Sequence, residues 1–382
     1  MRDKLFLITT VARTLQFFKG QPRLWKEHFE VCAIASEEED ILVKFAQDEA
    51  IRYKCVPMKR DISFIVDLKC LFTLLILFIK ERPRIVHANT PKASMLSMLA
   101  AWITCRPIRI YMCHGLRYET TSGILLKVLK TMEWIACHCA TQVIGVSQGV
   151  VERLVNDGLC SRNKIKVVGY GTAGGIDLTR FARKSLTGEP QVRSELNIPD
   201  DAFVFSFVGR IVRDKGINEL VEAFDKLSQE YHHVFLLLIG PEEGESDLIS
   251  SSSKELIKNN DRIYLLGNKE DVRPFIAESD AFVLPSYREG VGQVILEANA
   301  LDVPCIASDI IGPRDIITPM ENGELVKSKS VEALYDKMRD WVENPDKVAQ
   351  MAKLSRAYVK ARYEQEKVRE AYFKEYCNLA GI

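Results

Sequence analysis

The sequence predicts an α/β protein made of two doubly wound domains that face each other across a cleft. In both halves of the 382 residues, short apolar runs alternate with helix-like segments. This alternation is typical of parallel sheets that are covered by helices on both faces. Residues 169–199, rich in Gly, Thr, Ser and Pro with one short helical interruption, break the pattern and mark a domain boundary. Ligands of such sheets bind at the carboxyl ends of the strands, in the cleft.

Each half contributes its own set of elements. In the first half we expect strands at 4–9, 29–35, 84–88, 108–113, 141–146 and 164–168, and helices at 15–28, 64–81, 93–103, 124–138 and 148–156. In the second half we expect strands at 203–208, 234–239, 262–265, 281–284 and 304–307, and helices at 217–231, 272–277 and 293–301. From residue 331 the chain is helical and charged, with a break near Asn344-Pro345 and a last helix that runs to about 379. We therefore divide the chain into domains 1–178 and 179–362 and a C-terminal helix, 363–382, that crosses back to the first domain.

Composition and charge narrow the function classes. Hydrophobic residues make up 47% and charged residues 27% of the chain, as in an ordinary globular protein. A net charge of zero excludes a global basic field, so we expect no nucleic-acid partner and only local recognition of phosphate. The ten cysteines contain no C-x-x-C pair, and Cys137-His138-Cys139 lacks a second ligand pair. We therefore expect no metal site and a reducing, cytosolic environment.

The most hydrophobic segment is 64–79. Asp67 and Lys69 interrupt it, and the uninterrupted part is much shorter than the ~20 residues of a spanning helix. Two interpretations stay open: a core helix between strands, or a helix that also dips into a membrane surface. The first is favoured, and the second is supported by nearby cations, namely Lys59, Arg60, Lys80, Arg82 and Arg84. At the start of the chain only residues 5–8 are apolar, too few for the core of a secretory signal.

The stretch 281–300 predicts an anion site. A short apolar strand is followed by Pro285-Ser286, a polar turn with glycines at 290 and 292, and a helical run. Free N–H groups at a helix start, aided by the helix dipole, bind phosphate. Glu289 precedes this helix and Glu297 lies two turns into it; eight steps of about 100° return Glu297 to roughly the direction of the helix start. Two carboxylates thus flank a predicted phosphate cradle.

A cationic turn follows the first strand of the second half, in the sequence Gly209-Arg210-Ile-Val-Arg213-Asp214-Lys215-Gly216. Gly209 permits close backbone approach, while Arg210 and Lys215 offer a forked and a point cation that suit a diphosphate. Taken alone, the motif favours a solvated turn with Asp214 as a helix cap. Its occurrence in the same domain as the glutamate stretch favours the diphosphate clamp.

Two further motifs each allow a functional and a structural interpretation. His114 ends a predicted strand, which favours contact with a ligand over a purely structural role. Residues 169–174 match the dinucleotide pattern G-x-G-x-x-G, but no long helix follows them. We therefore interpret 169–174 as a flexible interdomain turn and not as a dehydrogenase fingerprint.

Taken together, three motifs resemble the retaining nucleotide-sugar glycosyltransferases of family 4, which have the GT-B fold. The motifs are Gly209-Arg210…Lys215-Gly216, Pro285-Ser286…Glu289…Glu297 and Gly175-Ile176-Asp177. The resemblance spans nearly the whole chain and implies a fold of two Rossmann-like domains. It implies that Glu297 holds the ribose hydroxyls and that Glu289 and His114 contact the donor sugar. The implied donor-binding residues are Gly209, Arg210, Lys215, Asn268, Glu289, Gly290, Val291, Gly292 and Glu297, and the implied catalytic residues are Glu289, His114, Arg210 and Lys215.

The first domain resembles more narrowly a bacterial subgroup that extends polyprenyl-diphosphate-linked or capsular and other surface polysaccharide precursors. The resemblance is carried by Ile8-Thr9-Thr10-Val11, Val86-His87…Thr90-Pro91-Lys92-Ala93 and His114-Gly115-Leu116-Arg117-Tyr118-Glu119. It implies four acceptor-side residues, Thr10, Arg13, Lys92 and Arg117. The chain departs from many relatives at Thr9-Thr10, where they have glycines, and at Val291, where they commonly have Phe.

The sequence therefore predicts a retaining, metal-independent glycosyltransferase without a cofactor. We expect transfer of an N-acetylhexosamine or hexose from a UDP-sugar to a hydroxyl of a lipid-linked or polysaccharide-precursor acceptor. We place the enzyme in the cytoplasm, at the inner face of the plasma membrane. A sugar-nucleotide epimerase, a glycoside hydrolase with paired carboxylates and a non-catalytic nucleotide-sugar-binding scaffold remain alternatives.

Overall fold

The structure is a computed structural model that describes residues 2–36, 38–59, 63–186, 191–242 and 247–382. The chain forms two compact units. Unit 1 comprises Met1–Gly175 and Gln365–Ile382, and unit 2 comprises Ile176–Glu364. The chain thus divides at 175 and 364, against the predicted 178 and 362. The residues next to both division points pair with each other, because the Ile176 N–H donates to the Tyr363 carbonyl at 2.7 Å.

Unit 1 contains a seven-stranded parallel sheet in the order β3-β2-β1-β4-β5-β6-β7. The strands are β1 (Asp3–Ile8), β2 (Phe29–Ala35), β3 (Arg52–Cys55), β4 (Ile85–Asn89), β5 (Ile108–Cys113), β6 (Gln142–Gly145) and β7 (Ile165–Val167). β1 is an interior strand, with Leu5 between Val31 of β2 and Ile85 of β4. Its last four residues are fully buried apolar side chains, as expected of a strand covered on both faces.

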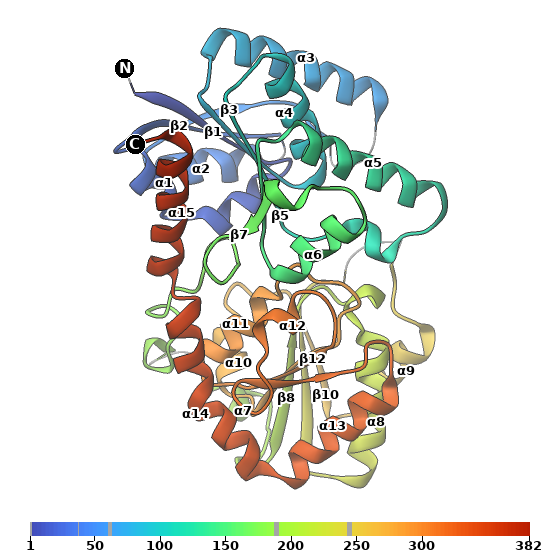
Figure 1. Cartoon of the computed structure of the whole chain (residues 1–382). Helices are drawn as coiled ribbons and strands as arrows, with labels where there is room; N and C mark the ends of the chain where they lie inside the picture. Colours follow the sequence, from blue (N-terminus) through green and yellow to red (C-terminus); the bar gives the residue numbers. More distant parts are fainter. Residues whose placement is uncertain (1, 37, 60–62, 187–190, 243–246) are drawn as a thin grey trace. The chain divides into compact units, whose positions relative to one another are not determined.

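Helices cover both faces of this sheet (Figure 1). They are η1 (Ala12–Phe18), α1 (Gln21–Trp25), α2 (Glu39–Glu49), α3 (Phe64–Glu81), α4 (Pro91–Ile103), η2 (Arg117–Thr120), α5 (Gly123–Cys139), α6 (Gln148–Asn156), η3 (Arg162–Lys164) and α15 (Gln365–Ala380). α4 packs on β1, β4 and β5 and lies between α3 and α5. The C-terminal α15 packs on α1, which contacts β2.

Unit 2 contains a six-stranded parallel sheet in the order β10-β9-β8-β11-β12-β13. The strands are β8 (Phe203–Val208), β9 (Val234–Ile239), β10 (Ile263–Gly267), β11 (Ala281–Leu284), β12 (Cys305–Ser308) and β13 (Gly323–Val326). The helices are η4 (Arg183–Leu186), α7 (Val192–Glu195), η5 (Arg213–Lys215), α8 (Ile217–Glu230), α9 (Ser251–Asn259), α10 (Arg273–Ala277), α11 (Gln293–Ala300), α12 (Pro313–Ile316), α13 (Val331–Glu343) and α14 (Pro345–Arg362). The two units confirm the predicted doubly wound α/β class.

The structure corrects some elements. The helix predicted at 15–28 is instead the short η1 and α1, because Gly20 has a left-handed φ of +83° and Pro22 stands at the start of the new turn. Among the described α-helices and strands, α2, β3, α9, α12 and β13 were not predicted, and neither were the 3-10 helices η2, η3 and η5. β3 and α9 are rich in polar residues, and α12 and β13 have four residues each, so their apolar signal is weak.

Residues 171–174 do not form the flexible interdomain turn that we predicted. The Thr172 N–H donates to the Val146 carbonyl at 2.7 Å, and the Thr172 carbonyl accepts from the Tyr372 hydroxyl at 2.9 Å. A Cβ on Gly171 would lie 2.4 Å from the Val146 oxygen, and one on Gly174 would lie 2.2 Å from the Phe17 oxygen. These glycines are therefore required by close packing inside unit 1.

Candidate active site

Two loops of unit 2 meet at the carboxyl ends of β8 and β11, because these strands are neighbours in the sheet. The Tyr287 N–H in the second loop donates to the Asp214 carbonyl in the first at 2.9 Å. Gly216, with φ +72°, lies so close to the second loop that an added Cβ would be 2.1 Å from the Pro285 oxygen. The glycine that ends the predicted cationic turn is thus required by both its conformation and its packing.

Two ion pairs join the charged side chains of these loops. Lys215 Nζ lies 2.5 Å from Glu289 Oε1, and the two side chains are 22% and 14% exposed. Arg288 Nη2 lies 3.1 Å from Asp214 Oδ2. Lys215 and Glu289, which are 74 residues apart in the sequence, therefore form one partly buried pair beside the predicted phosphate cradle.

The start of α11 provides the cradle itself. Gly292 precedes the helix with a left-handed φ of +86°. Within the part of the chain that the structure describes, no group accepts a hydrogen bond from the N–H of Val291 or Gly292. The segment before α12 packs against this turn, since a Cβ on Gly312 would lie 3.0 Å from the Gly290 carbonyl carbon. The turn is thus held in place while its amides can bind an anion.

The other predicted donor-binding residues lie on the same unit. Glu297, in α11, is half-buried, and burial raises its pKa to about 7 against the opposing charge of Arg180. Arg210 is half-buried directly after Gly209 at the end of β8. Asn268 is exposed and follows β10. Among the described contacts, none joins Glu297 or Asn268 to the Lys215–Glu289 pair.

Sequence reasoning gave no role to Tyr287. Its hydroxyl donates to Glu219 Oε1 at 2.5 Å, and the Lys329 ammonium lies 4.6 Å from the centre of its ring. These contacts fix the loop between β11 and Glu289. The sequence contains no local signal for them, because Glu219 lies 68 residues away.

Unit 1 contributes a second, largely uncharged group of residues. His114 follows β5, and its Nε2 lies 3.0 Å from Oδ1 of Asn89, the last residue of β4. The Phe17 ring stacks on the imidazole at 5.6 Å, and the Phe18 ring meets it edge-on at 6.1 Å. Burial lowers the pKa of His114 to about 4, so the ring is neutral at pH 7. Asn89 was missed from the sequence, where only its position at a strand end distinguishes it.

The four predicted acceptor-side residues differ in their exposure. Thr10 is 4% exposed and its hydroxyl lies 2.9 Å from that of Thr90, and Lys92 is 5% exposed with its ammonium 2.8 Å from Asp67 Oδ1. This burial leaves Thr10 and Lys92 little surface for an acceptor. Arg13 is exposed and pairs with Glu38 at 3.0 Å, and Arg117 is exposed in η2. Arg13 and Arg117 therefore keep the accessible charge that the prediction requires.

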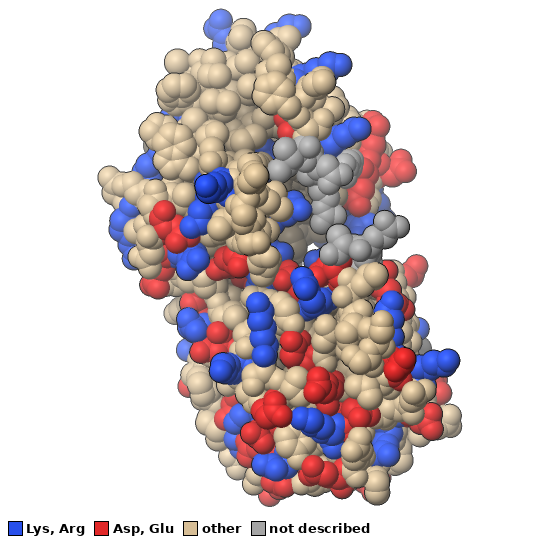
Figure 2. All heavy atoms as spheres, turned by 90° about the vertical axis from the view of Figure 1, so that its right-hand side faces the viewer, with Lys and Arg blue, Asp and Glu red and all other residues tan. Residues whose placement is uncertain are grey.

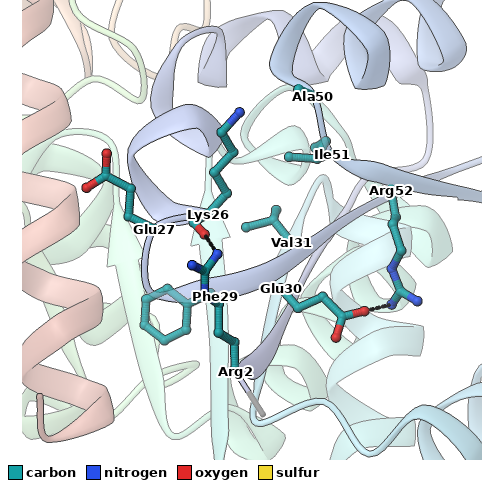
Figure 3. A pocket seen from close by; sticks show the side chains of 9 residues that line it. All are labelled: Arg2, Lys26, Glu27, Phe29, Glu30, Val31, Ala50, Ile51 and Arg52. Carbon is teal, nitrogen blue, oxygen red and sulfur yellow. Dashed lines mark hydrogen bonds and ion pairs between the residues drawn. The ribbon is translucent and has the colours of Figure 1, made fainter.

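A surface pocket of unit 1 lies at the amino ends of β2 and β3 (Figure 3). It is lined at the start of β2 by Phe29, Glu30 and Val31 and at the start of β3 by Arg52. Figure 3 shows the Arg52 guanidinium turned toward Glu30, which it contacts at 3.0 Å. His114 follows the carboxyl end of β5, so this pocket is separate from the group around His114. Ligands of parallel sheets usually bind at the carboxyl ends of the strands. Across the described residues there is no cluster of three or more His, Cys, Asp or Glu side chains that could hold a metal ion.

Comparison with known proteins defines the class of this chain. The family model for glycosyl transferases group 1 matches residues 189–358, and the model for glycosyltransferase family 4 matches residues 23–173. The capsular polysaccharide biosynthesis glycosyltransferase CapM of Staphylococcus aureus is 36% identical over 343 residues, which are 90% of this chain and 88% of CapM. The UDP-Gal:alpha-D-GlcNAc-diphosphoundecaprenol alpha-1,3-galactosyltransferase of Escherichia coli is 29% identical, over 86% of this chain and 84% of the relative.

The solved structures agree on the fold. HepE of Anabaena in complex with UDP has a TM-score of 0.80 at 19% identity, with 98% of this chain and 100% of that chain covered. The chain belongs to the family 4 and group 1 glycosyltransferases and has the GT-B fold. The predicted family and fold are thereby confirmed.

Proposed function

We propose that the chain is a retaining, metal-independent glycosyltransferase that moves a hexose or N-acetylhexosamine from a UDP-sugar to a hydroxyl of a lipid-linked or polysaccharide-precursor acceptor. The observation that carries this proposal is the Lys215–Glu289 pair beside the unbonded amides of Val291 and Gly292. The names of two similar proteins support the donor: the Escherichia coli enzyme is named for UDP-Gal, and the Anabaena structure contains UDP. The Escherichia coli name also specifies a diphosphoundecaprenol acceptor.

The chemistry follows from the charges. When the bond between the anomeric carbon and the diphosphate breaks, negative charge grows on the departing phosphate oxygens. Lys215, Arg210 and the N–H groups at the start of α11 can stabilise that charge without a metal. The acceptor oxygen bonds to the anomeric carbon on the face that the diphosphate leaves, and the acceptor proton passes to a phosphate oxygen. Glu289 then orients the sugar, and its bond to Lys215 sets where its carboxylate points.

The donor is tested by thermal shift of the purified protein with UDP, GDP, ADP, TDP and NAD, each with and without EDTA. We expect stabilisation by UDP that EDTA does not change and that Arg210→Ala abolishes. Lys226→Ala, which removes an exposed ion pair with Glu332 elsewhere in unit 2, is the matched control and keeps the shift. A shift with NAD alone, or with none of the five compounds, would overturn the proposal.

Retention is tested on the product. A radiolabelled UDP-sugar and a polyprenyl-diphosphate-linked acceptor give a new glycoside whose anomeric configuration is read by NMR. We expect the configuration of the donor to be kept, and no covalent sugar on Glu289 in the native enzyme. An inverted product would exclude retention but leave a glycosyltransferase, whereas hydrolysis of an aryl glycoside without any nucleotide would replace this proposal by the glycosidase alternative.

We also propose that unit 1 touches the inner face of the plasma membrane through α3, within the stretch 64–79. Among the described helices none is long and apolar enough to cross a membrane, so contact would be with the surface. One face of α3 belongs to the core, since Cys70, Leu74 and Phe78 are fully buried. Outside that face, five large apolar side chains are exposed: Phe64, Ile65, Phe72, Ile76 and Ile79 are 81%, 69%, 57%, 53% and 60% exposed.

The neighbouring helices extend this apolar surface. α4 ends in exposed Trp102 and Ile103, and α5 exposes Ile124, Leu125, Val128 and Trp134. The acids of these helices (Asp67, Glu81 and Glu133) are at least partly buried, whereas Lys69, Lys80 and Lys127 are exposed. Figure 2 shows a broad region of uncharged side chains with Lys and Arg at its edges. Arg60, one of the predicted flanking cations, lies outside the described residues. An apolar surface with exposed cations fits a bilayer that contains anionic lipid.

Co-sedimentation with vesicles of anionic and of purely zwitterionic lipid tests the membrane contact. The exposed pair Phe72→Ser and Ile76→Ser should release the protein from anionic vesicles, whereas Phe78 is a core residue and is unsuitable for the test. Leu248→Ser with Met320→Ser, which are 54% and 51% exposed in unit 2, is the control. Equal sedimentation of both double variants, with unchanged melting temperatures, would remove the membrane proposal and leave the transferase proposal intact.

A further inference from the structure

His114 has two ring nitrogens, and the structure distinguishes their surroundings. Nε2 lies 3.0 Å from Asn89 Oδ1. Among the described residues nothing bonds to Nδ1, and it is not one of the buried atoms that lack a partner. Nε2 therefore faces the protein, and Nδ1 is the atom that a substrate can reach.

The orientation of the Asn89 amide follows from its second contact. Its Nδ2 donates to the Ile8 carbonyl at 3.4 Å, and a carbonyl oxygen can only accept a hydrogen bond. In the reversed orientation the Asn89 oxygen would face the Ile8 carbonyl, and two acceptors would meet without a donor. Asn89 is fully buried, so water cannot supply that donor. Oδ1 must then face His114, and since Oδ1 can only accept, the proton of the neutral imidazole must be on Nε2.

We propose that Asn89 is a positioning residue that keeps the His114 proton on Nε2, so that Nδ1 meets the substrate as a hydrogen-bond acceptor for a sugar hydroxyl. The part about the substrate rests on the proposed glycosyl transfer; the part about the proton does not. The stacked Phe17 ring and the edge-on Phe18 ring fix the plane of the imidazole. The site therefore selects a hydroxyl proton on the substrate and would repel an anionic or carbonyl oxygen at the same place.

The titratable groups on the strands beside His114 are His87 on β4 and Arg109, Tyr111 and Cys113 on β5. His87, Tyr111 and Cys113 are buried, and Arg109 stands at the opposite end of β5 from His114. Burial lowers the pKa of His87 to about 3 and raises that of the Cys113 thiol, so both are neutral at pH 7. A carboxylate introduced at position 89 would thus be the nearest charge to the ring.

Nitrogen NMR of the protein labelled with ¹⁵N-histidine tests the proton directly and needs no substrate. The chain has six histidines, and His114→Asn assigns the signal of this one. We expect a neutral ring with its proton on Nε2 at pH 7. In Asn89→Asp the carboxylate still accepts from Nε2 but also favours the imidazolium, so Nδ1 gains a proton at pH 7. A wild-type ring with its proton on Nδ1 would overturn the proposal.

Kinetics with a UDP-sugar that the wild type transfers then measure the consequence for activity. We expect kcat/KM of Asn89→Asp to be about tenfold lower at pH 7 and to approach the wild-type value as pH rises and the imidazolium loses its proton. His114→Asn, which can place an amide oxygen near the position of Nδ1, should retain more activity than His114→Gln. Asn156→Asp, an exposed asparagine at the end of α6, is the control and should have the wild-type pH profile.

The outcomes separate the two proposals. If no UDP-sugar is turned over, the proposed function fails, while the NMR result still decides the position of the proton. If turnover occurs but Asn89→Asp has the same pH profile as the wild type, the positioning role of Asn89 fails and the transferase remains. Thermal melts of each variant show whether a loss of activity comes from misfolding.

Discussion

The two groups of candidate residues are built from different interactions. In unit 2 the loops after β8 and β11 carry charged side chains that are held by ion pairs, foremost Lys215 with Glu289. In unit 1 the residues around His114 are an amide and two phenyl rings, and the imidazole itself is neutral. One group is suited to a diphosphate, which needs cations and N–H donors, and the other to sugar hydroxyls, which need neutral hydrogen-bonding groups.

This contrast also determines how each group responds to substitution. In a partly buried ion pair, removal of one partner leaves an uncompensated charge. In a buried neutral hydrogen bond, removal of one partner leaves an unsatisfied polar atom, which costs less. Variants of the two groups should therefore differ in how much activity or stability they lose.

The largest effect is expected for the Lys215–Glu289 pair. Lys215→Met removes a cation that can stabilise the leaving diphosphate, and Glu289→Gln removes the carboxylate that we propose orients the sugar. Each should lower kcat/KM about 100-fold or more, measured with a UDP-sugar that the wild type transfers. Lys226→Met and Glu332→Gln, which break an exposed ion pair 3.0 Å long in the same unit, should change kcat/KM less than twofold. Equal losses in both sets of variants would show that the site pair has no special role.

A tenfold effect is expected for the pH dependence of UDP binding through Glu297. The family resemblance implies that Glu297 accepts from both ribose hydroxyls, a role that requires an ionised carboxylate. Burial raises the pKa of Glu297 to about 7. At pH 6 only about a tenth of Glu297 is ionised, so UDP should bind roughly tenfold more weakly than at pH 8. Calorimetry at pH 6 and pH 8 measures this ratio.

Glu297→Gln is the comparison that isolates this effect. Any change of affinity caused by titration of UDP itself persists in the variant, whereas the contribution of Glu297 disappears. Because the folded pKa of Glu297 is raised, the folded state binds more protons than the unfolded state between pH 4.5 and about 7. The stability of the unliganded wild type should therefore fall as pH rises through this window, and Glu297→Gln should reduce that fall. Glu321→Gln, an exposed acid of the same unit, should have neither effect.

How much of each site could be predicted depended on the distance between its partners in the sequence. The glycine turn and Glu289 lie in one contiguous stretch, with the strand and helix that position them, so local pattern was sufficient to predict an anion site there. The 2.5 Å bond from Glu289 to Lys215 could not be predicted, because it depends on β8 and β11 being neighbours in the sheet. Parallel strands are joined by long crossovers, and hydrophobic pattern does not specify their order.

In unit 1 a smaller part of the candidate site could be predicted from the sequence. His114 was predicted from its place at a strand end, but Asn89 and Phe17 were not, because nothing in their local sequence indicates which ring they contact. Lys92 shows a second limit. The resemblance implies an acceptor contact for it, which stays a prediction, whereas the burial of its side chain against Asp67 of α3, 25 residues earlier, could not be predicted. A charged residue next to a motif can be a core residue, and burial is not visible in a single sequence.

The smallest effect is expected for a neutral bond in unit 1. The Tyr376 hydroxyl of α15 lies 2.5 Å from Nδ1 of His87 on β4, and both side chains are fully buried. Tyr376→Phe leaves His87 without this partner and should lower the free energy of unfolding by about 1–2 kcal/mol. Tyr53→Phe, at a tyrosine that is 43% exposed, should be neutral. Because no charge is removed, the loss should be the same at low and high salt, whereas the loss of activity in Lys215→Met should vary with ionic strength. Amide hydrogen exchange can measure the stability of unit 1 by itself. If the loss of unfolding free energy in Tyr376→Phe depended on salt, the distinction between a charged and a neutral group would be contradicted.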